Sequence, residues 1–181
     1  MGRTASAVIA IVFAVLLQSA LVNRLPLPWG VGPDLVVLVV TALALRATPS
    51  AGALAGFTAG LAMDVMPPAE HEIGRYALVL GVAGYMVGSL RDTSWRSGLW
   101  PYGVAAMAVF GVALGYAFVG AILADPRVSL SSTLTLGGLS VVMTMLVSPL
   151  VLTPMLKVMR RLNRDRFGPI GEAPWIEGVL R

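Results

Sequence analysis

The chain has 181 residues, of which 57% are hydrophobic and 12% are charged, and its formal net charge is +4. An ordinary soluble domain carries roughly 25% charged residues, so this composition excludes a soluble core with a hydrophilic shell. The chain has no cysteine and one histidine, which excludes a disulfide framework, a thiolate metal site and a histidine metal cluster. We therefore expect an all-α integral membrane protein, one domain in length, without a cofactor.

Apolar stretches separated by short loops predict a polytopic bundle of about six transmembrane helices, because a bilayer core of about 30 Å takes about 20 helical residues to cross. The first stretch, 5–22, is longer than the apolar core of a cleavable signal peptide, so we expect a retained helix. A run of helix breakers, 23–33, follows. The second helix, 34–45, is too short to cross alone, so either its neighbours bury its ends or the bilayer thins around it.

The last four helices complete the predicted bundle. They are expected over 49–65, 74–90, 100–123 and 130–157. Pro149 and Pro154 each remove a backbone hydrogen bond from the last helix and predict a kink there. The chain then divides into a transmembrane bundle, 1–157, and a basic, partly disordered cytoplasmic tail, 158–181.

Lysine and arginine are distributed unevenly between the predicted loops, and cytoplasmic loops of membrane proteins are enriched in both. If the N-terminus is cytoplasmic, the cytoplasmic side holds Arg3, Arg46, Arg91, Arg96, Lys157, Arg160, Arg161, Arg164, Arg166 and Arg181, and the outer side holds Arg24, Arg75 and Arg127. Both termini are therefore expected in the cytoplasm. A re-entrant pair of second and third helices would leave the same orientation with fewer crossings.

Basic residues directly follow the last apolar span. They are Lys157, Arg160, Arg161 and Arg164. At the cytoplasmic surface each is attracted to anionic lipids by about 1 kcal/mol, so we expect contact with lipid headgroups.

Small residues recur at helical spacing in the third and fourth helices. One face of the third carries Gly52, Gly56, Gly60 and Asp64, with Phe57 beside them, and the fourth carries Gly81, Gly84 and Gly88, with Tyr85 beside them. Glycines in such a row let two helix backbones approach closely. One interpretation is that the third helix packs against the fourth. The alternative is a groove that receives a helix from another protein.

Two carboxylates border the apolar spans. Asp34 follows Pro33 at the start of the second helix, where the positive end of the helix dipole favours an anion. Asp64 lies in the last turn of the third helix, the unfavourable end, and an unpartnered acid at the membrane edge is costly. We therefore expect Asp64 to pair with Arg75, Arg24 or a donor from a partner.

These residues occur in an order that resembles one protein family. The order is Gly32-Pro33-Asp34, then Gly52-x-x-x-Gly56-Phe57-x-x-Gly60-Leu61-x-x-Asp64, then Gly74-x-Tyr76-Ala77-Leu78, then Gly84-Tyr85-x-x-Gly88-x-Leu90-Arg91. With the length and hydropathy profile, it resembles the bacterial rod shape-determining protein MreD family. The specific part of the resemblance is 33–91. The last two helices match only as apolar spans, and the first loop and the tail depart from the family.

The resemblance implies a non-enzymatic scaffold of the cell-elongation complex in the bacterial plasma membrane, which helps to organise lateral wall synthesis and maintain cell shape. The implied direct partner is MreC. MreB, RodA and a class B penicillin-binding protein are implied as further members of the complex, and no nucleic-acid partner is expected. The fold is expected to resemble the substrate-binding subunits of energy-coupling-factor transporters.

A second hypothesis is a vitamin-type small-molecule binding subunit of a membrane transporter with this architecture. It requires a cavity lined by polar and aromatic groups near the outer face. Trp29, Tyr76 and Tyr85 are candidates for this lining, although anchoring at the membrane interface explains such aromatics equally well. No Walker loop, dinucleotide fingerprint or zinc spacing indicates an enzyme.

Overall fold

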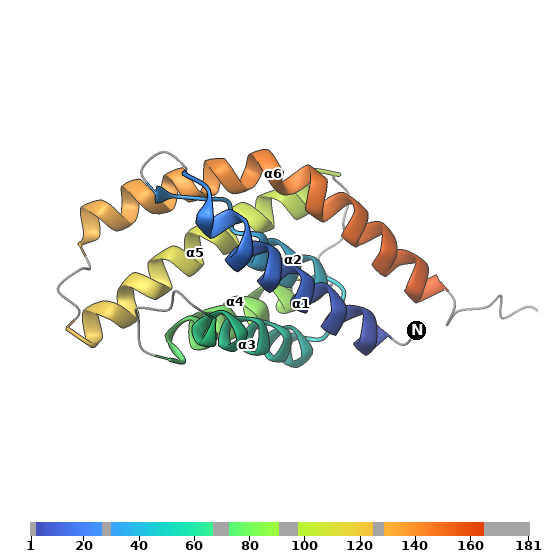
Figure 1. Cartoon of the computed structure of the whole chain (residues 1–181). Helices are drawn as coiled ribbons and strands as arrows, with labels where there is room; N and C mark the ends of the chain where they lie inside the picture. Colours follow the sequence, from blue (N-terminus) through green and yellow to red (C-terminus); the bar gives the residue numbers. More distant parts are fainter. Residues whose placement is uncertain (1–2, 27–29, 67–72, 91–97, 125–128, 165–181) are drawn as a thin grey trace, which may run out of the picture.

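The computed structural model describes residues 3–26, 30–66, 73–90, 98–124 and 129–164. Regular structure in these ranges is helical, without a β-strand (Figure 1). The elements are α1 (Arg3–Ala20), the 3-10 turn η1 (Val22–Arg24), α2 (Leu35–Ala44), α3 (Pro49–Val65), α4 (Arg75–Ser89), α5 (Trp100–Ile122) and α6 (Leu130–Arg164). The all-α class expected from the sequence is therefore the class of the structure.

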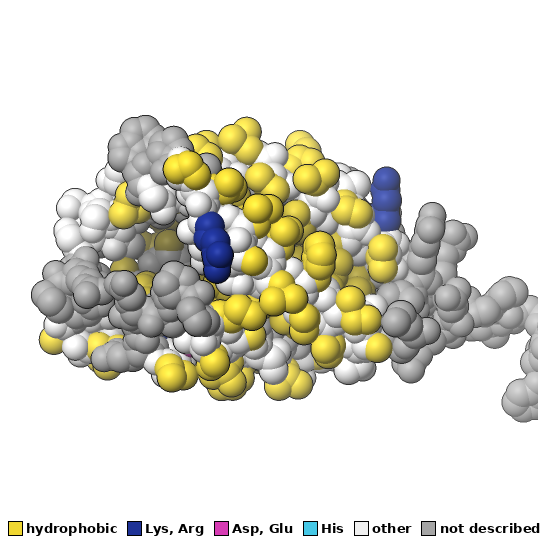
Figure 2. Space-filling model, viewed as in Figure 1, with side chains coloured by type: hydrophobic (Ala, Val, Ile, Leu, Met, Phe, Trp, Pro, Cys, Tyr) yellow, Lys and Arg dark blue, Asp and Glu magenta, His cyan; other side chains and the backbone are white. Residues whose placement is uncertain are grey.

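Three segments are long and apolar enough to cross a membrane, and they indicate a multi-pass membrane protein. They are Thr4–Arg24, Trp100–Ile122 and Ser131–Met159. Figure 2 shows a face covered mainly by hydrophobic side chains with few charges, as contact with lipid requires. α3 and α4 have 17 and 15 residues. At about 1.5 Å per residue both are shorter than a hydrocarbon core of about 30 Å.

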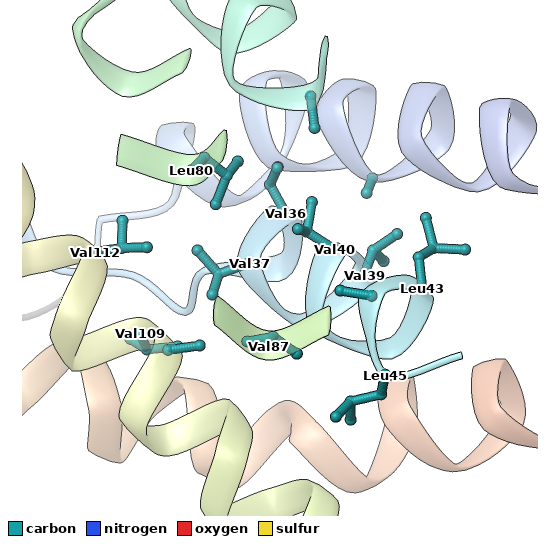
Figure 3. Packing of buried hydrophobic residues seen from close by; sticks show 14 of the residues in the cluster. Val36, Val37, Val39, Val40, Leu43, Leu45, Leu80, Val87, Val109 and Val112 are labelled. Atoms are coloured by element: carbon teal, nitrogen blue, oxygen red, sulfur yellow. The ribbon is translucent and has the colours of Figure 1, made fainter. Parts of the chain in front are cut away.

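The short helix α2 lies at the centre of the bundle. All 10 of its residues are buried, and it contacts α1, α3, α4, α5 and α6. Its sequence is apolar on every side, which is typical of a helix enclosed by protein. Figure 3 shows Val37 of α2 between Leu80 of α4 and Val109 of α5. Of the two sequence expectations for this helix, the structure shows enclosure by its neighbours.

The backbones of α3 and α4 touch along a glycine seam. A β-carbon added at Gly56 would overlap the carbonyl oxygen of Leu80, and one at Gly84 would overlap that of Gly52. Gly60 and Gly88 also lie close to the opposite backbone, at Ala77 and Pro49 respectively. The seam is therefore closed within the chain.

Phe57 and Tyr85 point away from the glycine seam and are 46% and 54% exposed. A β-carbon at Gly81 would lie 3.4 Å from that of Phe57, which is an ordinary contact. Leu54 and Val82 are exposed on the same two helices. The outer side of the α3–α4 hairpin is therefore an apolar surface with two aromatic side chains.

α6 continues through Pro149 and Pro154 and past Lys157 to Arg164, so it is longer than the sequence predicts. Its axis bends between its two halves in Figure 1, as the prolines predict. The exposed Lys157 and the three arginines expected at the lipid surface thus belong to one helix. The rest of the tail, 165–181, with its expected disorder, lies outside the described residues. Figure 1 places the N-terminus and the C-terminal end of α6 at the same end of the molecule.

We expect Gly56→Ala to destabilise the bundle, because its β-carbon would collide with the α4 backbone. Overpacking of this kind costs about 1–3 kcal/mol. Gly111→Ala in α5 is the matched control, since a β-carbon there meets no atom within 4 Å. Unfolding in mixed detergent micelles, followed by circular dichroism, measures both variants. Equal stability of the two variants would show that the seam is not packed as described.

Candidate functional site

Polar side chains gather at the N-terminus of α2, where Asp34 links three helices. One carboxylate oxygen, Oδ1, accepts a hydrogen bond from the backbone N–H of Val37 at 2.9 Å. The other, Oδ2, accepts one from the hydroxyl of Tyr76 in α4 at 2.7 Å. Its own backbone N–H donates to Oγ1 of Thr144 in α6 at 2.9 Å. Asp34 is thus both the cap of α2 and a junction between α2, α4 and α6.

Gln18 of α1 completes the cap of α2. Its Oε1 accepts a hydrogen bond from the backbone N–H of Leu35 at 2.9 Å. Its Nε2 donates to the carbonyl of Pro33 and to Oδ1 of Asn23, both at 3.1 Å. The first N–H groups of a helix have no acceptor within that helix, and lipid supplies none. The buried amide therefore takes the place that water holds at a solvent-exposed helix start.

Asp64 lies in the last turn of α3 and caps α4. It is 1% exposed. Its Oδ2 accepts hydrogen bonds from the N–H groups of Gly74 and Ala77 at 2.9 and 3.0 Å, and its Oδ1 accepts one from that of Tyr76 at 3.3 Å. Gly74 has a φ of 100°, a left-handed conformation that glycine adopts readily, and it turns the chain into α4. The carboxylate lies at the unfavourable end of α3 but at the favourable end of the α4 dipole.

Arg75 begins α4 and reaches toward α5. Its Nε and Nη2 donate to the backbone carbonyl of Tyr116 at 3.2 and 2.8 Å. The guanidinium carbon lies 3.8 Å from the centre of the Tyr116 ring, a cation–π distance. These contacts compensate for the burial of Arg75, which is 5% exposed. The pairing of Asp64 with Arg75, Arg24 or a partner's donor stays a prediction.

A pocket of about 270 Å³ lies among these groups. It is lined by Gln18, Asp34, Met63, Tyr76 and Tyr116, which come from α1, the cap of α2, α3, α4 and α5 in that order. The two tyrosine rings meet edge to face, with centroids 6.4 Å apart and planes at 68°. All the lining residues except Gln18 are only partly buried, so the pocket is open to the surface.

Several sequence-predicted residues meet at or beside this pocket. They are Pro33, Asp34, Asp64, Arg75 and Tyr76. Tyr85 lies on the outward face of α4, and Trp29 falls outside the described residues. The residues that the sequence pattern does not predict for this site are Gln18, Met63, Tyr116 and Thr144. Only Gln18 carries a usable signal, because a lone amide in an apolar helix needs a polar partner.

The arrangement is suited to binding. A carboxylate, two phenol rings and a thioether offer hydrogen bonds and an apolar wall to a small molecule. Among the described residues, no group of three or more His, Cys, Asp or Glu side chains could hold a metal ion. Comparisons of the chain with protein-family models, curated proteins and solved structures found no match.

We expect Asp64→Asn to lower the free energy of unfolding by about 1–3 kcal/mol, because charge-assisted hydrogen bonds become neutral ones and one acceptor is lost. Asp64→Ala, which removes both acceptors, is expected to cost more. Thr58→Ala is the control, because the exposed hydroxyl of Thr58 donates within its own helix. Unfolding in mixed micelles measures all three. If Asp64→Asn matched Thr58→Ala, the carboxylate would not be the cap of α4.

Proposed function

We propose that the chain is a non-enzymatic membrane scaffold of a bacterial cell-elongation complex and a member of the MreD family. The observation that carries the proposal is that the residues of the family-like motif contact one another. Asp34 accepts the hydroxyl of Tyr76, and Asp64 accepts the N–H of Gly74. The motif glycines close the α3–α4 seam. The family-like motif, residues 33–91, therefore belongs to one structural unit, which is what a family-specific fold requires.

The proposed direct partner is the membrane helix of MreC, with MreB, RodA and a class B penicillin-binding protein in the same complex. Because the α3–α4 seam is closed, we place the partner on α5. Gly103 and Gly111 lie eight residues apart, and a β-carbon at either would meet no atom within 4 Å. Met107 lies between them and is 76% exposed. This spacing puts the three residues along one helix face, where open glycines permit close approach of another helix.

The proposed topology has six crossings of the bacterial plasma membrane and both termini in the cytoplasm. The common position of the N-terminus and the C-terminal end of α6 supports an even number of crossings. The lysine and arginine distribution supports the orientation. A central α2 enclosed by longer helices fits the proposed likeness to the substrate-binding subunits of energy-coupling-factor transporters. The basic end of α6 then lies at the inner leaflet.

A second candidate function is a small-molecule binding subunit of a membrane transporter. The specific observation in its favour is the open pocket, which joins Asp34 to two aromatic side chains as a ligand site requires. Of the two tyrosines expected from the sequence, Tyr76 lines the pocket and Tyr85 faces outward. The second tyrosine of the lining is Tyr116. A scaffold and a ligand site use different surfaces, so one chain can carry both.

We expect MreC to co-purify with the wild-type chain from native membranes and Gly111→Leu to reduce its recovery at least several-fold. The added side chain would separate the two backbones at the α5 face. Gly138→Leu on α6 is the matched control, because that glycine is equally open. Quantitative mass spectrometry of the captured proteins measures recovery, with cell shape as a second readout.

Absence of MreC from the wild-type capture would reject the scaffold assignment. Normal recovery with Gly111→Leu would reject α5 as the docking face. A β-carbon at Gly111 would meet no atom within 4 Å, so we expect Gly111→Leu to fold. Its melting temperature in detergent checks this.

A further inference from the structure

We infer that the pocket binds a small organic cation, an amine or ammonium compound with an apolar or aromatic body. The inference rests on the second candidate function above, in which the pocket is a ligand site. It is independent of the scaffold proposal, because the α5 face and the pocket are different surfaces.

The carboxylate of Asp34 is the first reason. Among the described residues, its hydrogen-bond donors are the N–H groups of Val37 and Val36 and the Tyr76 hydroxyl, which are all neutral. The two carboxylate oxygens together have about four lone pairs, so the carboxylate can accept a further bond. An anion at membrane depth is costly without a countercharge. A ligand cation in the pocket would supply that countercharge.

Other charges near the pocket also disfavour an anionic ligand. The N-termini of α2 and α4 are capped by Asp34 and Asp64, so neither helix start is left as an anion site. The guanidinium of Arg75 is directed to the carbonyl and ring of Tyr116. Among the described residues that line the pocket, Asp34 is the charged one, so an anion would face a carboxylate there.

The aromatic wall is the second reason. The face of a phenol ring carries negative electrostatic potential and attracts ammonium groups. Arg75 already occupies one face of the Tyr116 ring. The charge of the ligand is therefore recognised by the carboxylate of Asp34, and the edge-to-face pair of Tyr76 and Tyr116 forms the aromatic wall beside it.

The rest of the lining determines the size and body of the ligand. The volume of about 270 Å³ lies near the lower end of ligand pockets, about 300–1,000 Å³, so the ligand is small. The thioether of Met63 offers an apolar, polarisable wall for the body. The amide of Gln18 is hydrogen-bonded to the backbone of Leu35 and Pro33. It therefore shapes the pocket and is not expected to bind the ligand.

Three probes with the same ring and side-chain length test the inference. They are 2-phenylethylamine, which is protonated at neutral pH, the neutral 2-phenylethanol and the anion phenylacetate. The full-length protein in lipid nanodiscs is titrated with each in a calorimeter, with empty nanodiscs subtracted. We expect the amine to bind at least about tenfold more tightly than either of the others.

Side-chain variants then locate the binding. Asp34→Asn keeps an oxygen for the Val37 N–H but removes the charge, and we expect it to abolish the preference for the amine. Tyr76→Phe is expected to weaken amine binding several-fold, because it removes the hydroxyl that orients the carboxylate. Tyr85→Phe is the matched control outside the pocket and is expected to leave the affinity unchanged.

Equal affinity for the three probes, or tighter binding of phenylacetate, would overturn the cation inference while leaving the pocket as a ligand site. No binding of any probe at millimolar concentration would overturn the inference and remove the support for the second candidate function. The comparison of probes uses only the wild-type chain, so it decides the matter even if Asp34→Asn does not fold.

Discussion

The N-terminus of α2 lies within the bundle, and its first backbone N–H groups must find acceptors there. Lipid provides none, and an unsatisfied group in such surroundings costs several kcal/mol. Gln18 accepts from Leu35, Asp34 accepts from Val37, and Thr144 accepts from Asp34. This requirement brings polar side chains of α1 and α6 to one point in an apolar protein. The pocket and its carboxylate follow from the way a short helix is capped inside the bundle.

The first N–H groups of α4 also need acceptors within the bundle, and the glycine seam connects this helix start to the start of α2. Asp64 satisfies the first N–H groups of α4, while Gly56 and Gly84 bring the α3 and α4 backbones into contact. This close approach fixes the start of α4, from which the Tyr76 hydroxyl reaches Asp34. The polar site is therefore held by the helix packing itself, so substitutions in the seam are expected to disturb the pocket as well as the bundle.

Features that depend on one helix could be read from the sequence, and features that depend on several could not. The third helix, expected over 49–65, is observed at Pro49–Val65, because a cap and prolines mark its ends. The Asp64 partners were not foreseeable from the dipole of its own helix, because they belong to α4. Contact between Arg75 and Tyr116 joins residues 41 positions apart. The pocket depends on how five helices are placed relative to one another, and the hydrophobic periodicity of each helix gives no information on that placement.

The central claim, an open polar pocket within a membrane-embedded bundle, can be tested with two single-cysteine variants, since the chain has no cysteine of its own. Met63 lines the pocket and is partly buried, whereas Met107 lies on the outer apolar surface and is 76% exposed. A water-soluble maleimide modifies thiols that water reaches. In native membranes we predict fast labelling of Met63→Cys and little labelling of Met107→Cys. Faster labelling of Met107→Cys than of Met63→Cys would contradict this prediction. That order is expected if both side chains were in water, because Met107 is the more exposed of the two.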